Sequence, residues 1–148
     1  QGFYQLMGQL PQERIAIAVM STAMAEKAVE ETIAYTKDRK AFGKTVFDFQ
    51  NTRFKLAECA TKVQVANSML ADFIARHARG ELTTEEASMA KWWCTQMACE
   101  VADECLQLHG GYGYMTEYPI AKIYADLRVQ RIFGGTNEIM KEIISRSL

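Results

Sequence analysis

The sequence is poor in residues that interrupt helices. Proline occurs only at Pro11 and Pro119, and glycine occurs nine times in 148 residues. Alternation of apolar and polar residues with a period of two, which marks a half-buried strand, is never sustained. The long uninterrupted segments that remain favour helices.

The sequence also lacks the signals of several functional classes. Its formal net charge is -1, which gives no electrostatic basis for binding nucleic acid. The longest wholly apolar run, residues 15–20, is too short to cross a bilayer, so we expect no membrane insertion. The first residues show no signal-peptide pattern and the chain opens without methionine, so we expect a piece of a longer protein.

Metal-binding and disulfide patterns are absent as well. None of the four cysteines forms a C-x-x-C pair, and all lie in helix-like segments. We interpret them as reduced, buried or half-buried thiols of an intracellular protein. The two histidines, His77 and His109, are not spaced for zinc, and no metal is expected.

The first two predicted helices are long. One spans about 11–37, with Pro11 in its first turn, where the missing N–H is harmless. The second spans about 49–79, with Asp48 as N-cap and Gly80 ending it. Apolar residues at spacings of three and four predict buried faces that include Met20 and Ala60.

Three further helices follow. Thr83 and Glu86 form a capping-box pattern before a helix at about 84–108, whose predicted core face includes Trp93. A fourth runs from Pro119 to about residue 132, and a short last helix follows two glycines. Short connections between long helices predict an all-α fold, an antiparallel four-helix bundle with a short additional C-terminal helix.

Four segments carry more than a bundle requires. They are Leu-Pro-Gln-Glu-Arg at 10–14, Arg-Lys-Ala-Phe-Gly-Lys at 39–44, Gln-Leu-His-Gly-Gly-Tyr-Gly at 107–113 and Phe-Gly-Gly-Thr-Asn-Glu at 133–138. In this order and spacing, with Thr-Glu-Tyr-Pro before the last, they resemble the acyl-CoA dehydrogenase family over essentially the whole chain. Residues 1–148 then correspond to the C-terminal domain, without the family's N-terminal helical and central β domains.

The resemblance implies an FAD-dependent enzyme that oxidises an acyl-CoA to the trans-2-enoyl-CoA. It further implies a homodimer or homotetramer, electron-transfer flavoprotein as acceptor, and a bacterial cytoplasm or mitochondrial matrix. The isolated domain is expected to bind FAD weakly and to be inactive. Two alternatives remain open: an acyl-CoA oxidase, and a non-catalytic helical assembly module that kept the fold.

The resemblance also predicts the catalytic base. Many members carry a glutamate at the position of Gly134, which has no side chain to take a proton. The isovaleryl and long-chain branches place it near the start of the first helix instead, where Glu13 stands. We therefore predict Glu13 as the base and the Gly134 backbone N–H as a donor to the thioester carbonyl. The alternative is a surface glutamate that complements the helix dipole, which would weaken it as a base.

Further site residues follow from the same resemblance. Near the acyl-CoA we expect Arg14, Phe133 and Gly135, although Arg14 could equally be a solvated arginine. The predicted FAD-binding residues are Arg39, Phe42, Gln50, Gln107, Gly110, Gly111, Thr136 and Glu138.

Three of the FAD-binding predictions have a structural alternative. Arg39 suits a pyrophosphate but also complements a helix C-terminus. Gly110 could simply cap a helix, and Glu138 could be an ordinary glutamate of a first helical turn. We interpret His109 as an orienting or packing residue rather than a ligand or base.

Overall fold

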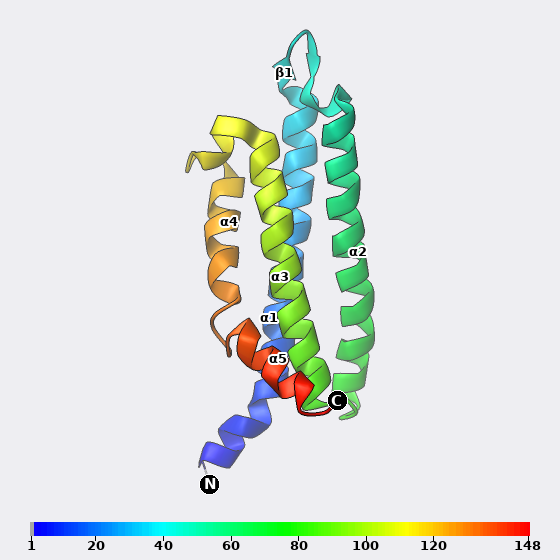
Figure 1. Cartoon of the computed structure of the whole chain (residues 1–148), viewed down its shortest axis with the longest axis vertical. Coiled ribbons are helices and arrows are strands. Elements are labelled where there is room, and N and C mark those ends of the chain that lie inside the picture. The colour runs from blue at the N-terminus through cyan, green and yellow to red at the C-terminus, as the bar shows by residue number, and fades with distance from the viewer. Residues whose placement is uncertain (1) are drawn as a thin grey trace.

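The computed structural model describes residues 2–148 as a helical bundle with one additional helix. Helices α1 (Gly2–Asp38), α2 (Gln50–Ala78), α3 (Thr84–His109) and α4 (Pro119–Gln130) run alternately up and down, and α5 (Asn137–Ser145) lies across the lower end (Figure 1). The predicted all-α architecture is confirmed. Among residues 2–148, no helix combines the length and apolarity needed to cross a bilayer.

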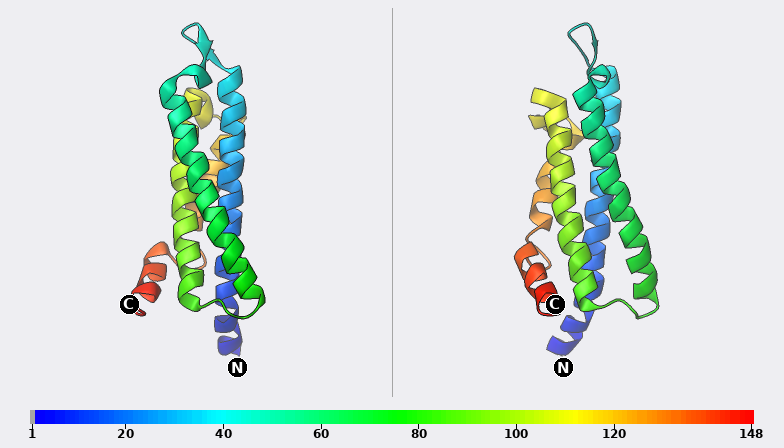
Figure 2. Two further views of the ribbon diagram at one scale, coloured as in Figure 1. Left: turned by 90° about the vertical axis from the view of Figure 1, so that its right-hand side faces the viewer. Right: turned by 45° about the vertical axis from the view of Figure 1, so that its right-hand side comes forward.

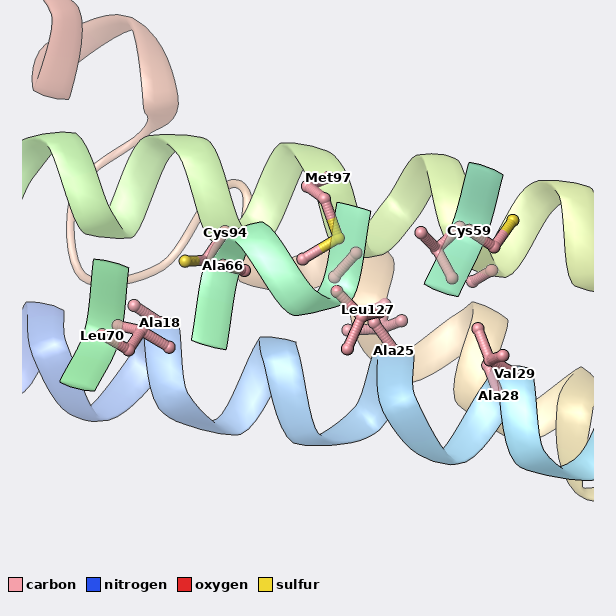
Figure 3. Close-up of a cluster of buried hydrophobic side chains, with 14 of the residues drawn as sticks. Ala18, Ala25, Ala28, Val29, Cys59, Ala66, Leu70, Cys94, Met97 and Leu127 are labelled. Carbon is pink, nitrogen blue, oxygen red and sulfur yellow. The ribbon is translucent and has the colours of Figure 1, made fainter. Parts of the chain in front are cut away.

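Helices α1 and α3 form the centre of the bundle. Both contact α2 on one side and α4 on the other (Figure 2). Both helices carry fully buried alanines, whose small side chains let neighbouring backbones approach closely. We call these residues the alanine seam: Ala18, Ala25 and Ala28 of α1, and Ala87, Ala90 and Ala98 of α3. Figure 3 shows larger side chains, among them Leu70, Met97 and Leu127, in the same buried cluster.

Helix α1 begins well before the predicted start. It includes residues 2–10, and Pro11 lies inside it rather than in its first turn, so that prediction was wrong. Proline removes one intrahelical hydrogen bond and favours a kink, but a helix can continue on both sides of it. Glu13 therefore lies in a helix interior, where the dipole of the N-terminus has little effect.

Asp48 does not cap α2. Its carboxylate instead accepts hydrogen bonds from the Thr45 N–H at 3.0 Å and the Thr45 hydroxyl at 2.7 Å, while Phe49 occupies the N-cap. These bonds lower the pKa of Asp48. The prediction of Asp48 as the N-cap of the second helix was therefore wrong: Asp48 is the third residue of the short 3₁₀ turn Val46–Asp48, whose N-cap is Thr45.

The other predicted helix ends are confirmed. After α2 the N–H of Gly80 donates to His77 O and that of Glu81 to Arg76 O, with Gly80 at a φ of 71°. Thr83 and Glu86 form the capping box at the start of α3.

Three residues predicted to be buried lie outside the core. Met20 is 43% exposed, and Trp93 and Ala60 are also exposed. The apolar spacing gave the approximate direction of each buried face but not its width. The cysteine prediction is confirmed: all four are free, and all but the half-buried Cys99 are buried.

Candidate functional site

The predicted site residues lie in two groups at opposite ends of the bundle. The upper group comprises Arg39, Phe42, Gln50, Gln107, Gly110 and Gly111, and the lower group comprises Glu13, Arg14, Phe133, Gly134, Gly135, Thr136 and Glu138. Along α3, the rise from the level of the lower group at Lys91 to Gln107 is roughly 24 Å at 1.5 Å per residue. One subunit therefore does not bring the two groups together.

The upper group is built around a small hairpin. Strands β1 (Lys40–Ala41) and β2 (Lys44–Thr45) pair antiparallel and were not predicted as strands. Their two-residue turn places both Phe42 and Gly43 at positive φ, 54° and 81°, as a type I′ turn requires. Glycine adopts this backbone freely, whereas a bulky phenylalanine is strained in it. The Phe42 side chain is nevertheless 96% exposed, so little packing within the chain compensates for the strain.

A cavity of about 570 Å³ lies between the end of α1 and the glycine-rich turn after α3. Its lining includes Arg39, Gln107, Gly110 and Gly111, so the structure gathers four predicted cofactor residues there. The Arg39 guanidinium stacks over the Tyr112 ring, 5.1 Å from its centroid, which orients it. Phe42 and Gln50 lie at the same end but do not line this cavity.

The two glycines of this turn lack side chains for different reasons. Gly110 has a φ of 61°, which strongly favours glycine at a helix C-cap. Gly111 has no such φ, and a Cβ there would meet no atom within 4 Å. Neither backbone conformation nor packing within the chain therefore explains Gly111, which leaves open space beside the cavity.

His109 is a packing residue, as predicted. Its Nδ1 lies 2.8 Å from Cys105 O, and because a carbonyl only accepts, Nδ1 carries the proton. The ring stacks on Tyr35 at 4.2 Å, and the Tyr35 hydroxyl donates to His109 O at 3.1 Å. Burial lowers the pKa of His109, so the ring is neutral near pH 7.

The lower group centres on the Gly134–Gly135 turn, where both residues have positive φ, 67° and 95°. A Cβ on Gly134 would collide with Cδ1 of Ile17, and one on Gly135 would lie 2.7 Å from Cε of Met140. Ile17 follows Glu13 by one helical turn, so both lie on the same side of α1. The turn thus packs next to the face that carries Glu13, and a side chain at position 134 would be strained by the positive φ and would have to displace the Ile17 Cδ1 methyl group.

Glu13 and Arg14 differ sharply in exposure. Glu13 is exposed, whereas Arg14 is only 5% exposed and donates from Nη1 to Ser88 Oγ at 3.3 Å. The interpretation of Arg14 as a solvated arginine is therefore wrong. Burial lowers the pKa of Arg14, partly offset by the charge of Glu13. Its Nε has no hydrogen-bond partner among the described residues.

Lys91 is a site residue that the sequence analysis missed. Its side chain is 0% exposed and donates to Gly135 O at 2.7 Å and to Asn137 Oδ1 at 3.0 Å. Burial lowers its pKa to about 8, opposed by the charge of Glu138 and reinforced by that of Arg14. A signal was present, because Lys91 interrupts the buried alanine stripe of α3.

Thr136 and Glu138 form the start of α5. The Thr136 hydroxyl accepts from the Ile139 N–H at 3.3 Å, as an N-cap does. The pKa of Glu138 is lowered, first by its own backbone N–H and then by Thr136. Within residues 2–148 no cluster of three His, Cys, Asp or Glu side chains is placed to hold a metal ion.

The packing of Gly134 yields a stability prediction. Gly134→Ala is expected to lower the free energy of unfolding by about 1–3 kcal/mol more than Gly43→Ala, measured by urea denaturation. Both glycines have positive φ, but a Cβ at position 43 meets nothing within 4 Å. Ile17→Val removes the colliding methyl group, so it should reduce the excess effect of Gly134→Ala. Equal effects at the two glycines would contradict this packing.

The pKa of Lys91 yields a pH dependence. In the folded state Lys91 loses its proton near pH 8, and in the unfolded state near 10.5. Between these values the unfolded state binds more protons, so the stability of the wild type should rise with pH. Relative to Lys91→Met, the gain should be on the order of 3 kcal/mol. Urea denaturation of both proteins from pH 7.5 to 10.5 tests this, since other titrating groups cancel in the difference. A stability difference between the two proteins that does not change with pH would show that the pKa of Lys91 is not lowered.

Comparison with known proteins identifies the family. The family sequence model described as "Acyl-CoA dehydrogenase, C-terminal domain" matches residues 1–148. The long-chain specific acyl-CoA dehydrogenase of mouse mitochondria is 51% identical over 148 residues, which are 100% of this chain and 34% of that protein. The chain thus spans about a third of the length of this relative.

Solved structures share the fold closely. The acyl-CoA dehydrogenase of Geobacillus kaustophilus is 48% identical, with a TM-score of 0.95 over 98% of this chain and 38% of that one. A Mycobacterium smegmatis glutaryl-CoA dehydrogenase, solved in complex with FADH2, is 26% identical, with a TM-score of 0.90 over 93% of this chain and 36% of that one. This chain belongs to the acyl-CoA dehydrogenase family, as its C-terminal domain.

Proposed function

We propose that the chain is part of an FAD-dependent enzyme that converts an acyl-CoA to the trans-2-enoyl-CoA, with Glu13 as the catalytic base. The observation that carries this proposal is the packing of Gly134 against Ile17, one turn from Glu13. The turn excludes a side chain where many relatives carry the base, and it lies next to a face that offers a carboxylate. This arrangement favours the long-chain or isovaleryl type of site.

The chain's own groups have complementary tasks in this reaction. Glu13 removes the α-proton of the acyl thioester, and a bound acyl chain that excludes water strengthens it as a base. The Gly134 N–H donates to the thioester carbonyl oxygen, where negative charge develops as the proton leaves. Arg14, with an unpartnered Nε, adds positive charge beside Glu13. Bound FAD would supply the redox chemistry, as the acceptor of the hydride from the β-carbon.

Features of the upper group fit a cofactor with phosphates and flat rings. Arg39 is held over Tyr112 at the edge of the cavity and could bind a pyrophosphate. Gly111 leaves space that nothing in the chain fills, and the strained, exposed Phe42 offers an aromatic face. Gln107 and Gly110 line the same cavity, and Gln50 begins the neighbouring helix.

The separation of the two groups supports a shared site. In this proposal the upper group of one subunit binds FAD together with Thr136 and Glu138 of another, which requires a homodimer or homotetramer. The remaining two thirds found in relatives would complete the flavin and substrate pockets, so the chain alone should have no activity. Electron-transfer flavoprotein is the proposed acceptor, in a bacterial cytoplasm or mitochondrial matrix.

Glu13→Gln tests the proposed base in a protein that carries this chain together with the other two thirds found in its relatives. The variant keeps the shape but cannot take a proton, so bleaching of bound flavin by a long-chain acyl-CoA should slow at least about a hundredfold. FAD content and acyl-CoA affinity should be unchanged. Glu26→Gln, an exposed glutamate elsewhere on α1, is the matched control and should bleach normally.

Two results would oppose this assignment. Bleaching of Glu13→Gln at the wild-type rate would place the base elsewhere. Failure of the FAD-loaded wild type to bleach with straight-chain or branched acyl-CoA would favour the non-catalytic assembly module. Rapid reoxidation of the reduced wild type by dioxygen would instead favour an oxidase.

Gly111→Leu tests the cofactor cavity independently of turnover. Position 111 has no positive φ and no neighbouring atom, so the free energy of unfolding should change by less than about 1 kcal/mol. The dissociation constant of FAD, measured by fluorescence titration of the same longer protein, should rise at least about tenfold because the side chain fills the space. Unchanged FAD affinity would remove this cavity from the proposed cofactor site.

A further inference from the structure

We propose that Lys91 is a positioning residue that fixes the Gly134–Gly135 turn, so that the Gly134 N–H faces the carbonyl oxygen of a bound acyl thioester. This inference rests on the proposed function, because it assigns a role to a residue that would act through the turn. Among the described hydrogen bonds and ion pairs, none joins Lys91 to the proposed base Glu13.

Side chains from three helices contact the turn. Among the contacts described above, that of Lys91 is the only polar one. Ile17 of α1 lies against Gly134, and Met140 of α5 lies against Gly135. These apolar contacts limit where the glycines can move but do not orient their peptide groups. The bond of 2.7 Å from Lys91 Nζ to Gly135 O fixes the Gly135–Thr136 peptide from α3, and this anchors the end of the turn that follows Gly134.

Asn137 extends this arrangement to both ends of the loop. Its backbone N–H donates to Arg131 O at 3.0 Å, which closes the loop from residue 131 to 137. Its side-chain oxygen accepts from Lys91 at 3.0 Å and from Thr95 at 3.1 Å. Lys91 and Thr95 lie one turn apart on α3, so a single helical face anchors the loop and the start of α5.

Bundle packing alone does not explain a lysine at this position. A methionine of similar length would fill the space without the free-energy cost of burying an ammonium group. Lys91 makes no ion pair with a carboxylate among the described residues. A buried charge that lacks such compensation is expected where function requires it.

The surroundings of the turn have more donors than acceptors. Two buried nitrogens on neighbouring side chains, Arg14 Nε and Asn137 Nδ2, have no hydrogen-bond partner in the part of the chain that the structure describes. Arg14 and Lys91 also place two buried positive charges near the turn. Such an environment suits a ligand oxygen that gains negative charge, and a turn held rigidly keeps its N–H aimed at that oxygen.

Lys91→Met tests the role in the FAD-loaded longer protein. Flavin bleaching at saturating acyl-CoA should slow by roughly a hundredfold, since small displacements of a reacting geometry have effects of this size. The dissociation constant of acyl-CoA should stay within about threefold, because most binding contacts lie elsewhere. Lys27→Met, which removes an exposed lysine from α1, is the matched control and should bleach normally.

Hydrogen exchange gives a readout that does not depend on turnover. In Lys91→Met, amide exchange in the segment 131–138 should accelerate at least tenfold, while exchange in the rest of α3 stays unchanged. A variant that bleaches at the wild-type rate, or whose segment 131–138 exchanges as in the wild type, would overturn the inference. Slower bleaching that is explained entirely by loss of FAD would also overturn the inference.

Substitutions of Asn137 keep the inference testable if Lys91→Met fails to fold. Asn137→Leu removes the acceptor, whereas Asn137→Asp retains it and suits the first turn of α5. The leucine variant should bleach at least tenfold more slowly than the aspartate variant; equal rates would contradict the inference. Wild-type bleaching of Glu13→Gln would defeat the proposed base instead, and the exchange experiment would still decide whether Lys91 fixes the turn.

Discussion

The close packing of α1 against α3 along the alanine seam is the constraint on which the rest of the structure depends. Two hydrogen bonds mark the register of this pair: Arg14 to Ser88 near the lower end and Tyr35 to His109 at the upper end. Both join residues 74 positions apart in the sequence, so the offset is kept over an axial rise of about 32 Å. A larger residue in the seam would separate the helices and disturb both ends at once.

This shared register links the two groups of site residues mechanically. At the lower end it brings Ile17 against the Gly134 turn and Lys91 beneath it; at the upper end it brings Arg39 beside Tyr112. The bundle works as a rigid spacer that presents one set of groups at each end. A site assembled between subunits requires such a spacer, because the cofactor and substrate groups must keep a fixed separation.

Much of the fold was predictable from local signals. The capping box at Thr83 and the glycine exit at Gly80 are determined by residues a few positions apart, and both were predicted correctly. The start of α1 was missed because proline near a plausible start looks the same as proline inside a helix. Met20 was misplaced because helical periodicity gives the direction of a buried face but not its width.

The site shows the same division between local and tertiary information. Motifs indicated Glu13 and Gly134, but only the structure reveals that Ile17 occupies the space where a side chain at position 134 would go. The sequence marks Lys91 as a lysine within a buried stripe, but not its partners Gly135 and Asn137, which lie more than 40 positions away.

Lys91 also shows how a fold can retain a residue that opposes its stability. Its lowered pKa means that the folded state disfavours the charged form, so burying the ammonium reduces the free energy of unfolding below pH 8. The alanine seam and the apolar contacts around Met97 and Leu127 supply stability along the length of the bundle and can offset this local loss. The proposed benefit of the buried lysine is that its hydrogen bonds hold the loop that leads into α5 in one orientation. The strained Phe42 turn lies in the exposed hairpin that follows α1, whereas the Gly134 turn packs against Ile17 of α1 and is tied to the bundle by that contact.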